Sequence, residues 1–411
     1  MRKGRLGGIA ALAGLLATGC ASAQAAPAVS HGIAEKLPAV SARPLGTADT
    51  GFGLDVLHAW CQNDPRDNLV FSPSTLATAL GMAYLGARGT TARAMANTLH
   101  LPAGALSGLE AGLQARTAGL AGLDGPGVTV SASNQIWADP SLVTLRAYLN
   151  ALATSYAAGV ERAPLTRDPD QAANEIDQAI STATHGQISR LISPDMLDGT
   201  GWVLTSALYL DAAWAVPFDP NQTWQGQFTT TAKAPVTANY MHQGGFRFGT
   251  SDGWTGVTIP YRGGKLSMVA LLPPPTASGC AVPDTAALSA IGAGAADGDT
   301  ADIALPKVSL SSSGSMNDLL KSLGMGVAFG DQADFSGLSP QACCIGFVQQ
   351  AATLRVGEKG TVGAAAAAVG IVASSGIVAS RQVDFDRPYL LLVTTSNGEP
   401  LFLARVANPA A

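Results

Sequence analysis

Apolar residues recur with two different periods along the chain, and each period predicts one kind of element. Where they recur every three to four positions, we expect helices with one buried face. Capping residues predict where three of these helices begin: Ser72 before Pro73, Asp168 before Pro169, and Ser315 paired with Asp318 as a capping box. Gly86 and Gly324 predict the ends of the first and third helices.

Runs of apolar or alternating residues predict strands at 128–137, 203–210, 266–272, 389–394 and 401–406. The helical patterns crowd the first half of the chain and the strands crowd the second. A regular alternation of strand and helix would predict a parallel sheet, so this order favours an α+β fold.

The composition limits the classes to which the protein can belong. Of 411 residues, 47% are hydrophobic and 13% are charged, against roughly a quarter charged residues in typical soluble domains. Such a chain is not intrinsically disordered. Its 24 basic and 29 acidic residues include no block rich in Lys and Arg, so we expect no nucleic-acid partner.

Residues 1–19 are typical of a signal peptide. Three basic residues precede an apolar stretch, residues 6–16, that is too short to span a bilayer. Cys20 follows Ala17-Thr18-Gly19, which resembles a bacterial lipobox and predicts lipidation of Cys20. Ala21-Ser22-Ala23 offers an ordinary cleavage site as the alternative. We expect a protein of the bacterial cell envelope, periplasmic or on the outer surface, that touches the membrane only through its lipid anchor, or else a secreted protein.

Residues 20–45 are rich in Ala, Pro and Ser, and this composition predicts a flexible tether. Beyond them the sequence contains no further linker and no internal repeat. We therefore expect residues 46–411 to form a single domain.

The remaining cysteines are Cys61, Cys280, Cys343 and Cys344, too few for a disulfide framework in a chain of this length. Adjacent cysteines pair only with strain, so we expect Cys343 and Cys344 to be small buried thiols rather than a bridge. The pairing of the four stays open.

One motif has the form of a hydrolase nucleophile elbow, with Ser251 between Gly249 and Gly253. An elbow requires a helix after the serine and a histidine later in the chain. Residues 254–259 instead resemble a turn and a strand, and all five histidines precede Ser251. Because no zinc or phosphate-binding motif occurs either, we expect no metal, no cofactor and no enzymatic activity.

Residues 362–380 form a run of 19 residues without a charge. A membrane span and a buried Ala-rich helix are both disfavoured, because the run contains glycines, serines and β-branched residues but neither Leu nor Phe. We favour a mobile loop of small residues that can become a strand, since it contains no proline to remove a ladder hydrogen bond.

Several motifs spread along the chain occur together: Asn68 to Pro73 with Tyr84 to Gly89, Leu204 to Trp214, Met241-His242-Gln243, Ile259-Pro260-Tyr261, Phe385 to Tyr389, and Leu401 to Pro409. Together they resemble the signature of the serpin family of serine protease inhibitors over residues 53–409, and the chain looks like a bacterial member. The resemblance implies helices packed on a large central mixed sheet, two smaller sheets and an exposed reactive-centre loop.

The family's mechanism would make the protein a suicide substrate. A serine protease attacks the loop, and the cleaved loop then enters the central sheet as a new strand while the acyl-enzyme is still intact. The resemblance implies a monomer whose partner is an elastase- or subtilisin-like serine protease, with cysteine proteases as a further target class. The alternatives are a non-inhibitory serpin scaffold or ligand carrier and, outside the family, a surface lipoprotein adhesin.

The resemblance assigns two groups of residues to loop insertion. The hinge comprises Glu358, Gly360, Thr361, Val362, Gly363, Ala364, Ala365 and Ala366. The shutter beneath the sheet comprises Ser72, Thr75 and Gln350. Thr75, Gln350 and Ser206 depart from the family's usual Ser, His and Asn, but these polar replacements are expected to form hydrogen bonds in a rewired shutter.

Two counts locate the reactive bond differently. Counting sixteen residues from Glu358 by the family's hinge spacing gives Ser374-Ser375, with Ala373 just before it, whereas counting back from Phe385 gives a bond near Ile377. We favour Ser374-Ser375, because the inserted strand must match a fixed sheet length. A small residue at the bond suits the shallow pockets of elastase- or subtilisin-like proteases.

Overall fold

The computed structural model describes residues 27–102, 106–296, 299–361 and 381–411. Its helices are α1 (Arg43–Asn63), α2 (Pro73–Gly86), α3 (Gly89–Thr98), α4 (Leu106–Ala121), α5 (Arg146–Tyr156), α6 (Pro169–Ala183), α7 (Thr285–Ala296) and α8 (Asn317–Leu320). The signal peptide and Cys20 lie outside the described residues.

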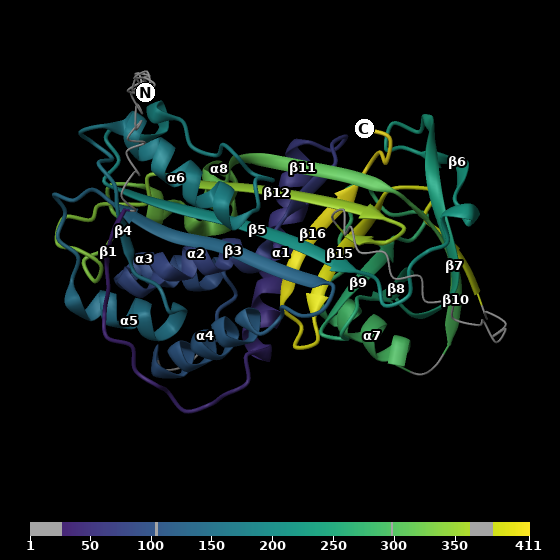
Figure 1. Cartoon of the computed structure of the whole chain (residues 1–411), viewed down its shortest axis with the longest axis horizontal. Helices are drawn as coiled ribbons and strands as arrows, with labels where there is room; N and C mark the ends of the chain where they lie inside the picture. Colours follow the sequence, from purple (N-terminus) through teal and green to yellow (C-terminus); the bar gives the residue numbers. More distant parts are fainter. Residues whose placement is uncertain (1–26, 103–105, 297–298, 362–380) are drawn as a thin grey trace, which may run out of the picture.

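Seven strands form a mixed sheet, here called the central sheet. In spatial order they are β1 (Ala28–Ser30), β4 (Val160–Arg162), β3 (Val128–Ala138), β5 (Trp202–Ala213), β13 (Gly360–Thr361), β12 (Val348–Gly357) and β11 (Val308–Ser315). Figure 1 shows α2, α3, α4 and α5 on one side of this sheet and α6 on the other. The expected α+β architecture, with helices packed on a large central mixed sheet, is confirmed.

The second sheet runs in the order β14 (Arg381–Asp384), β10 (Thr300–Pro306), β7 (Pro235–Ser251), β8 (Trp254–Pro260), β9 (Leu266–Leu272), β15 (Tyr389–Thr395), β16 (Pro400–Val406) and β2 (Leu69–Phe71), with β6 (Trp224–Thr229) also on β7. Strand β7 is 17 residues long and pairs with β6 and β10 along its first part and with β8 at its end. The two smaller sheets that we expected are therefore joined through β7.

The local predictions were mostly confirmed. Ser72 caps α2 and Asp168 caps α6, each by accepting a hydrogen bond from the backbone N–H three residues on. All five predicted strands are present, and β9 has the predicted bounds. The capping box was wrong: Ser315 is the last residue of β11, Met316 is the cap residue of α8, and the Ser315 hydroxyl accepts from the Asn317 N–H at 3.2 Å.

Ser251, the serine of the elbow-like motif, ends β7, opposite Trp254 of β8. Asp252 and Gly253 form the turn between them, with φ values of 50° and 79°. A β-hairpin with this geometry cannot present Ser251 at the start of a helix, so the rejection of the hydrolase motif was correct.

The N-terminal segment departs from the expected flexible tether. Strand β1 pairs with β4, and α1 begins at Arg43. Between them, the backbone N–H of Glu35 donates to the Thr154 hydroxyl, and that of Leu37 donates to the Gln114 side chain. Residues 28–45 therefore lie on the domain, because side chains of α4 and α5 bind their backbone.

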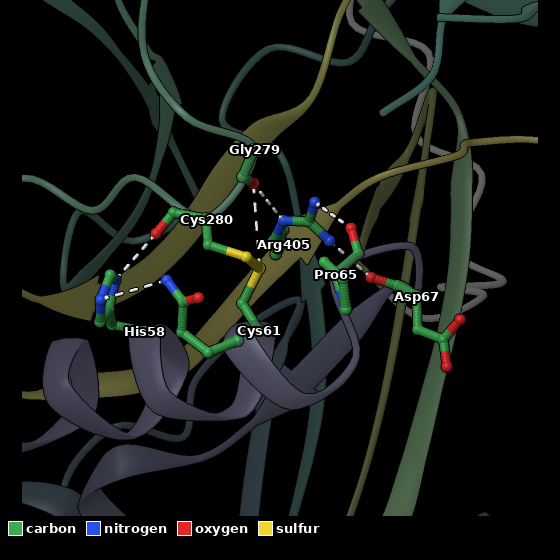
Figure 2. The surroundings of a disulfide bond; sticks show 8 residues. His58, Cys61, Pro65, Asp67, Gly279, Cys280 and Arg405 are labelled. Atoms are coloured by element: carbon green, nitrogen blue, oxygen red, sulfur yellow. Dashed lines mark hydrogen bonds between the residues drawn. A yellow bond between two sulfur atoms is a disulfide. The ribbon is translucent and has the colours of Figure 1, made fainter. Parts of the chain in front are cut away.

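The cysteines also differ from the expectation. Cys61 near the end of α1 and Cys280 before α7 form a disulfide across 219 residues (Figure 2). Cys343 and Cys344 are free, as predicted, but Cys343 is exposed and Cys344 is half-buried. They lie in the irregular segment between α8 and β12, so neither is a core residue.

No helix in the described ranges combines the length and the apolar character needed to cross a membrane. The core is divided by the central sheet. One cluster of buried residues fills the space between the central and second sheets, and a smaller one lies beneath α6.

Candidate functional site

The hinge begins as a short strand inside the central sheet. Strand β13 lies between β12 and β5, with Thr361 opposite Val356 on one side and Ala212 on the other. Gly360 has a φ of 156°, and a Cβ at this position would overlap the carbonyl oxygen of Ala212. The close approach of the two backbones explains the glycine.

Backbone and side-chain hydrogen bonds anchor the turn before β13. The backbone N–H of Trp214 donates to Lys359 O at 3.0 Å, and that of Phe218 donates to Glu358 O at 2.9 Å. The indole N–H of Trp214 donates to Gly357 O at 2.9 Å. The predicted hinge residues Glu358, Gly360 and Thr361 thus sit in an ordered sheet end, which we call the hinge end.

Glu358 also receives two side-chain hydrogen bonds. Lys307 Nζ donates to its carboxylate at 2.9 Å and the Thr223 hydroxyl donates at 3.1 Å. Burial alone would raise the pKa of Glu358, but the hydrogen bond and the charge of Lys307 outweigh it and lower the pKa below its usual value. The carboxylate is therefore ionised at neutral pH.

Thr361 is completely buried, and its hydroxyl is hydrogen-bonded to the Tyr261 hydroxyl. The Tyr261 ring stacks on Trp214 with 4.4 Å between centroids. Because the tyrosine is fully buried, its pKa is raised, so it stays protonated and can donate. Small side chains are required here, since the core closes directly over Thr361.

The opposite end of the central sheet, here called the far end, is closed by direct pairing. Residues Val348 to Ala351 of β12 pair in parallel with Leu204 to Ala207 of β5. Between the two ends, residues 208–211 of β5 pair with neither β12 nor β13 within the described ranges. Within the described residues, β13 therefore ends at Thr361, beside the stretch at residues 208–211 of β5 that we call the gap between β5 and β12.

The shutter residues lie beneath the far end, but they do not form one hydrogen-bonded group. Ser72 and Thr75 bond to each other: the Thr75 N–H donates to Ser72 Oγ at 3.3 Å and the Thr75 hydroxyl donates to Ser72 O at 3.4 Å. Gln350 is 1% exposed, and neither atom of its amide has a hydrogen-bond partner among the described residues. The expectation that Gln350 would bond within the shutter was wrong.

A row of buried polar side chains crosses the sheet at this level. Ser206 lies opposite Gln350 on one side and Asn134 of β3 on the other. The Ser206 hydroxyl and the Asn134 side-chain oxygen also lack partners in the described part of the chain. Within the described residues, no hydrogen bond joins these neighbouring side chains across the strands.

Sequence reasoning did not select Tyr261, Lys307 or Asn134 for the site. Tyr261 stood in a recognised motif, Ile259-Pro260-Tyr261, but its contact with Thr361 spans 100 residues. Lys307 and Asn134 belong to no sequence motif that would have identified them, because only the strand register brings them to the site.

The predicted hinge residues Val362 to Ala366 and the reactive-bond candidates Ala373, Ser374, Ser375 and Ile377 lie outside the described residues. The 19-residue run for which three interpretations were weighed lies there too.

Comparisons with known proteins agree with this arrangement. Residues 47–409 match the family model "Serpin (serine protease inhibitor)". Human leukocyte elastase inhibitor is 27% identical over 89% of this chain and 99% of its own length. The native state of tengpin, a thermophilic serpin, superposes with a TM-score of 0.77, 22% identity and coverage of 93% and 100% of the two chains.

Human thyroxine-binding globulin complexed with its hormone superposes with a TM-score of 0.76, at 24% identity over 90% of this chain and all of that one. The fold is thus shared with inhibitors and with a carrier. The family match, the sheet order and the hinge between β12 and β5 lead to one conclusion: the chain belongs to the serpin family.

Proposed function

We propose that the protein inhibits serine proteases of small or apolar specificity as a suicide substrate. The observation that carries the proposal is the position of β13. It enters the central sheet at the hinge end, next to residues 208–211 of β5, which pair with β3 but with neither β12 nor β13 among the described residues. The residues that follow β13 in the sequence are small and uncharged.

The register of β13 supports the hinge count of the reactive bond. Thr361 lies opposite Ala212 in antiparallel register, so each further inserted residue would pair with one residue earlier in β5. Continued to Trp202, the start of β5, this register would end at residue 371. Ser374 follows three residues later, a short span from the end of the sheet to a protease attached at the Ser374-Ser375 bond.

The composition of the inserted segment is compatible with the core. Thr361 and every second residue after it would point to the same face of the sheet as Ala212, Leu210 and Leu208. This face belongs to the core between the two sheets. The side chains arriving there would be those of Gly363, Ala365 and Ala367. Small side chains can enter without displacing the packed neighbours.

Insertion would move the attached protease a long way. Sixteen steps at about 3.3 Å carry the ester roughly 50 Å, from one end of the sheet to the other. New ladder hydrogen bonds and burial supply the free energy, which is released only after cleavage.

The test is incubation with elastase, subtilisin and trypsin, followed by denaturing gels and mass spectrometry. We expect a covalent complex with elastase or subtilisin and a new N-terminus at Ser375. Cleavage without a complex would contradict inhibition and favour a non-inhibitory scaffold or ligand carrier. A complex cleaved at Ile377 would instead support the position obtained by counting back from Phe385.

We further propose that the protein is exported and anchored through Cys20. The Cys61–Cys280 disulfide is compatible with an oxidising compartment. In a bacterial host, the wild type should partition into detergent and Cys20→Ser into the aqueous phase. Equal partitioning of the two would contradict lipidation.

A further inference from the structure

A cavity of about 240 Å³ lies on the second sheet, away from the hinge. Its walls come from the turn between β6 and β7, the start of β8, the loop at 273–281 and the first residues of β15, with Arg405 of β16. We call it the cationic pocket, because Lys233, Arg387 and Arg405 line it and no Asp or Glu is among its described lining residues.

Arg405 is 2% exposed and has no carboxylate partner in ion-pair range among the described residues. Its guanidinium donates instead to the carbonyl oxygens of Gly279 at 2.8 Å, Asp67 at 2.8 Å and Pro65 at 2.9 Å, as Figure 2 shows. Carbonyl dipoles hold the side chain in place, and the charge of Asp67 acts on it without a direct ion pair. A buried cation of this kind favours an anion nearby.

Arg387 adds a donor without a hydrogen-bond partner. Its Nη2 donates to Pro273 O at 2.8 Å, and its Nη1 lies 3.4 Å from the exposed carboxylate of Asp386. Its Nε is buried and has no hydrogen-bond partner among the described residues. The side chain, which lines the pocket, is thus fixed at its tip while its Nε–H has no partner among the described residues.

Gly279 lines the cationic pocket between Thr231 and Arg405. A Cβ on Gly279 would stand 3.3 Å from Thr231 Cγ2 and 3.7 Å from Arg405 Nη2, two residues of the same pocket. Gly279 therefore keeps the narrow space between Thr231 and the buried cation Arg405 free of a side chain. The next residue, Cys280, is tied to α1 by the disulfide, which holds this wall in place without a ligand.

Other lining residues are apolar and flat. Trp254 and the prolines 273–275 line the same cavity. A cavity of roughly 150 Å³ can hold benzene, so this one has room for an aromatic ring system and an acid group. The basic side chains favour an anionic group, and the flat surfaces of Trp254 and the prolines favour an apolar part of the ligand.

We propose that the cationic pocket binds a small organic carboxylate with an aromatic or similarly flat apolar body. The carboxylate would lie between Arg387, Lys233 and the Gly279 backbone, and the ring would lie against Trp254. None of the described residues that line the pocket belongs to the hinge or the shutter.

The test compares 1-naphthoate with 1-naphthamide, which has nearly the same shape but no charge, by calorimetry and thermal shift on the intact protein. We expect a dissociation constant below about 1 mM for the acid and at least about tenfold weaker binding of the amide. Equal affinities would overturn recognition of the charge, and absence of saturable binding of the acid would overturn the proposal.

Variants locate the site. Lys233→Gln and Arg387→Gln should each weaken 1-naphthoate binding about three- to tenfold, and Gly279→Val should abolish it by filling the open space. Lys265→Gln, an exposed lysine at a different cavity, is the matched control and should bind like the wild type. Because Arg387 also contacts Pro273, the unliganded unfolding midpoint is measured for every variant. Undiminished binding by folded Lys233→Gln and Gly279→Val would overturn the assignment.

Discussion

The two ends of the gap between β5 and β12 are held together in different ways. At the hinge end, Glu358, Thr361 and Trp214 all have hydrogen-bond partners, and small side chains pack against a closed core. At the far end, Gln350 and Ser206 are equally buried, but their side chains have no partners among the described residues.

This difference indicates where the central sheet resists opening. A buried polar group without a partner costs about 1–3 kcal/mol, so the closed far end is destabilised by its own shutter residues. The hinge end gains stability from the same kinds of atoms because they are paired. The sheet is therefore poised to separate at the far end, where a new strand would have to pass, while the start of that strand is already fixed.

The largest effect is expected from Thr361→Arg at the hinge end. The side chain would carry a charge into a fully buried position, at a cost of several kcal/mol (about 3 or more), so insertion should fail and the inhibitor should become a substrate. The measurement is the stoichiometry of inhibition with elastase. Lys359→Arg, at the neighbouring exposed position, is the control, and an unchanged stoichiometry for Thr361→Arg would contradict insertion.

Cleavage in the loop should remove the difference in strand pairing between the hinge end and the far end of the central sheet. A complete inserted strand would pair β5 and β12 along their whole length, so the unfolding midpoint should rise by more than about 10 °C. Calorimetry before and after limited elastase digestion measures this change. Equal midpoints would indicate a serpin that does not insert its loop.

Gln350→Met should stabilise the far end. The substitution keeps the volume and removes two unpaired polar atoms, so the free energy of unfolding should rise by about 1–2 kcal/mol. Inhibition should become slower, because the closed far end is harder to open. Thermal unfolding and the association rate with protease test both parts, and a lower midpoint would show that Gln350 is stabilising as it stands.

The smallest effect concerns the ion pair at the hinge end. Lys307 is 42% exposed, so its contact with Glu358 is worth about 0.5–1 kcal/mol at most. The pKa of Glu358 is lowered on folding, so this stability is present above the ordinary value of 4.5 and is lost as the pH falls below it.

Glu358→Gln should therefore destabilise the protein slightly at pH 7 and not at all near pH 3. Thermal unfolding of both proteins across this pH range measures the difference. A difference that grows as the pH falls would contradict the assignment of this pair.

Two parts of the site show the limits of prediction from sequence. Glu358, Gly360 and Thr361 were assigned through family motifs, and the structure places them at a sheet end as expected. Gln350 was assigned to the shutter in the same way, and the structure gives neither atom of its amide a hydrogen-bond partner among the described residues. The sequence shows that Gln350 has an amide that can form hydrogen bonds. Whether these bonds form depends on where the fold places Ser206 and Asn134.

The sequence by itself determined the elements whose stabilising contacts are local. Ser72 and Asp168 cap helices by accepting a hydrogen bond from the backbone N–H three residues on. Alternating apolar residues likewise indicate the strands from neighbouring positions alone. The tertiary structure alone decided the pairing of Cys61 with Cys280, the contact of Thr361 with Tyr261 and the cations around the pocket. The disulfide and the Thr361 contact join residues 219 and 100 positions apart, and strand register and helix packing bring such distant residues together.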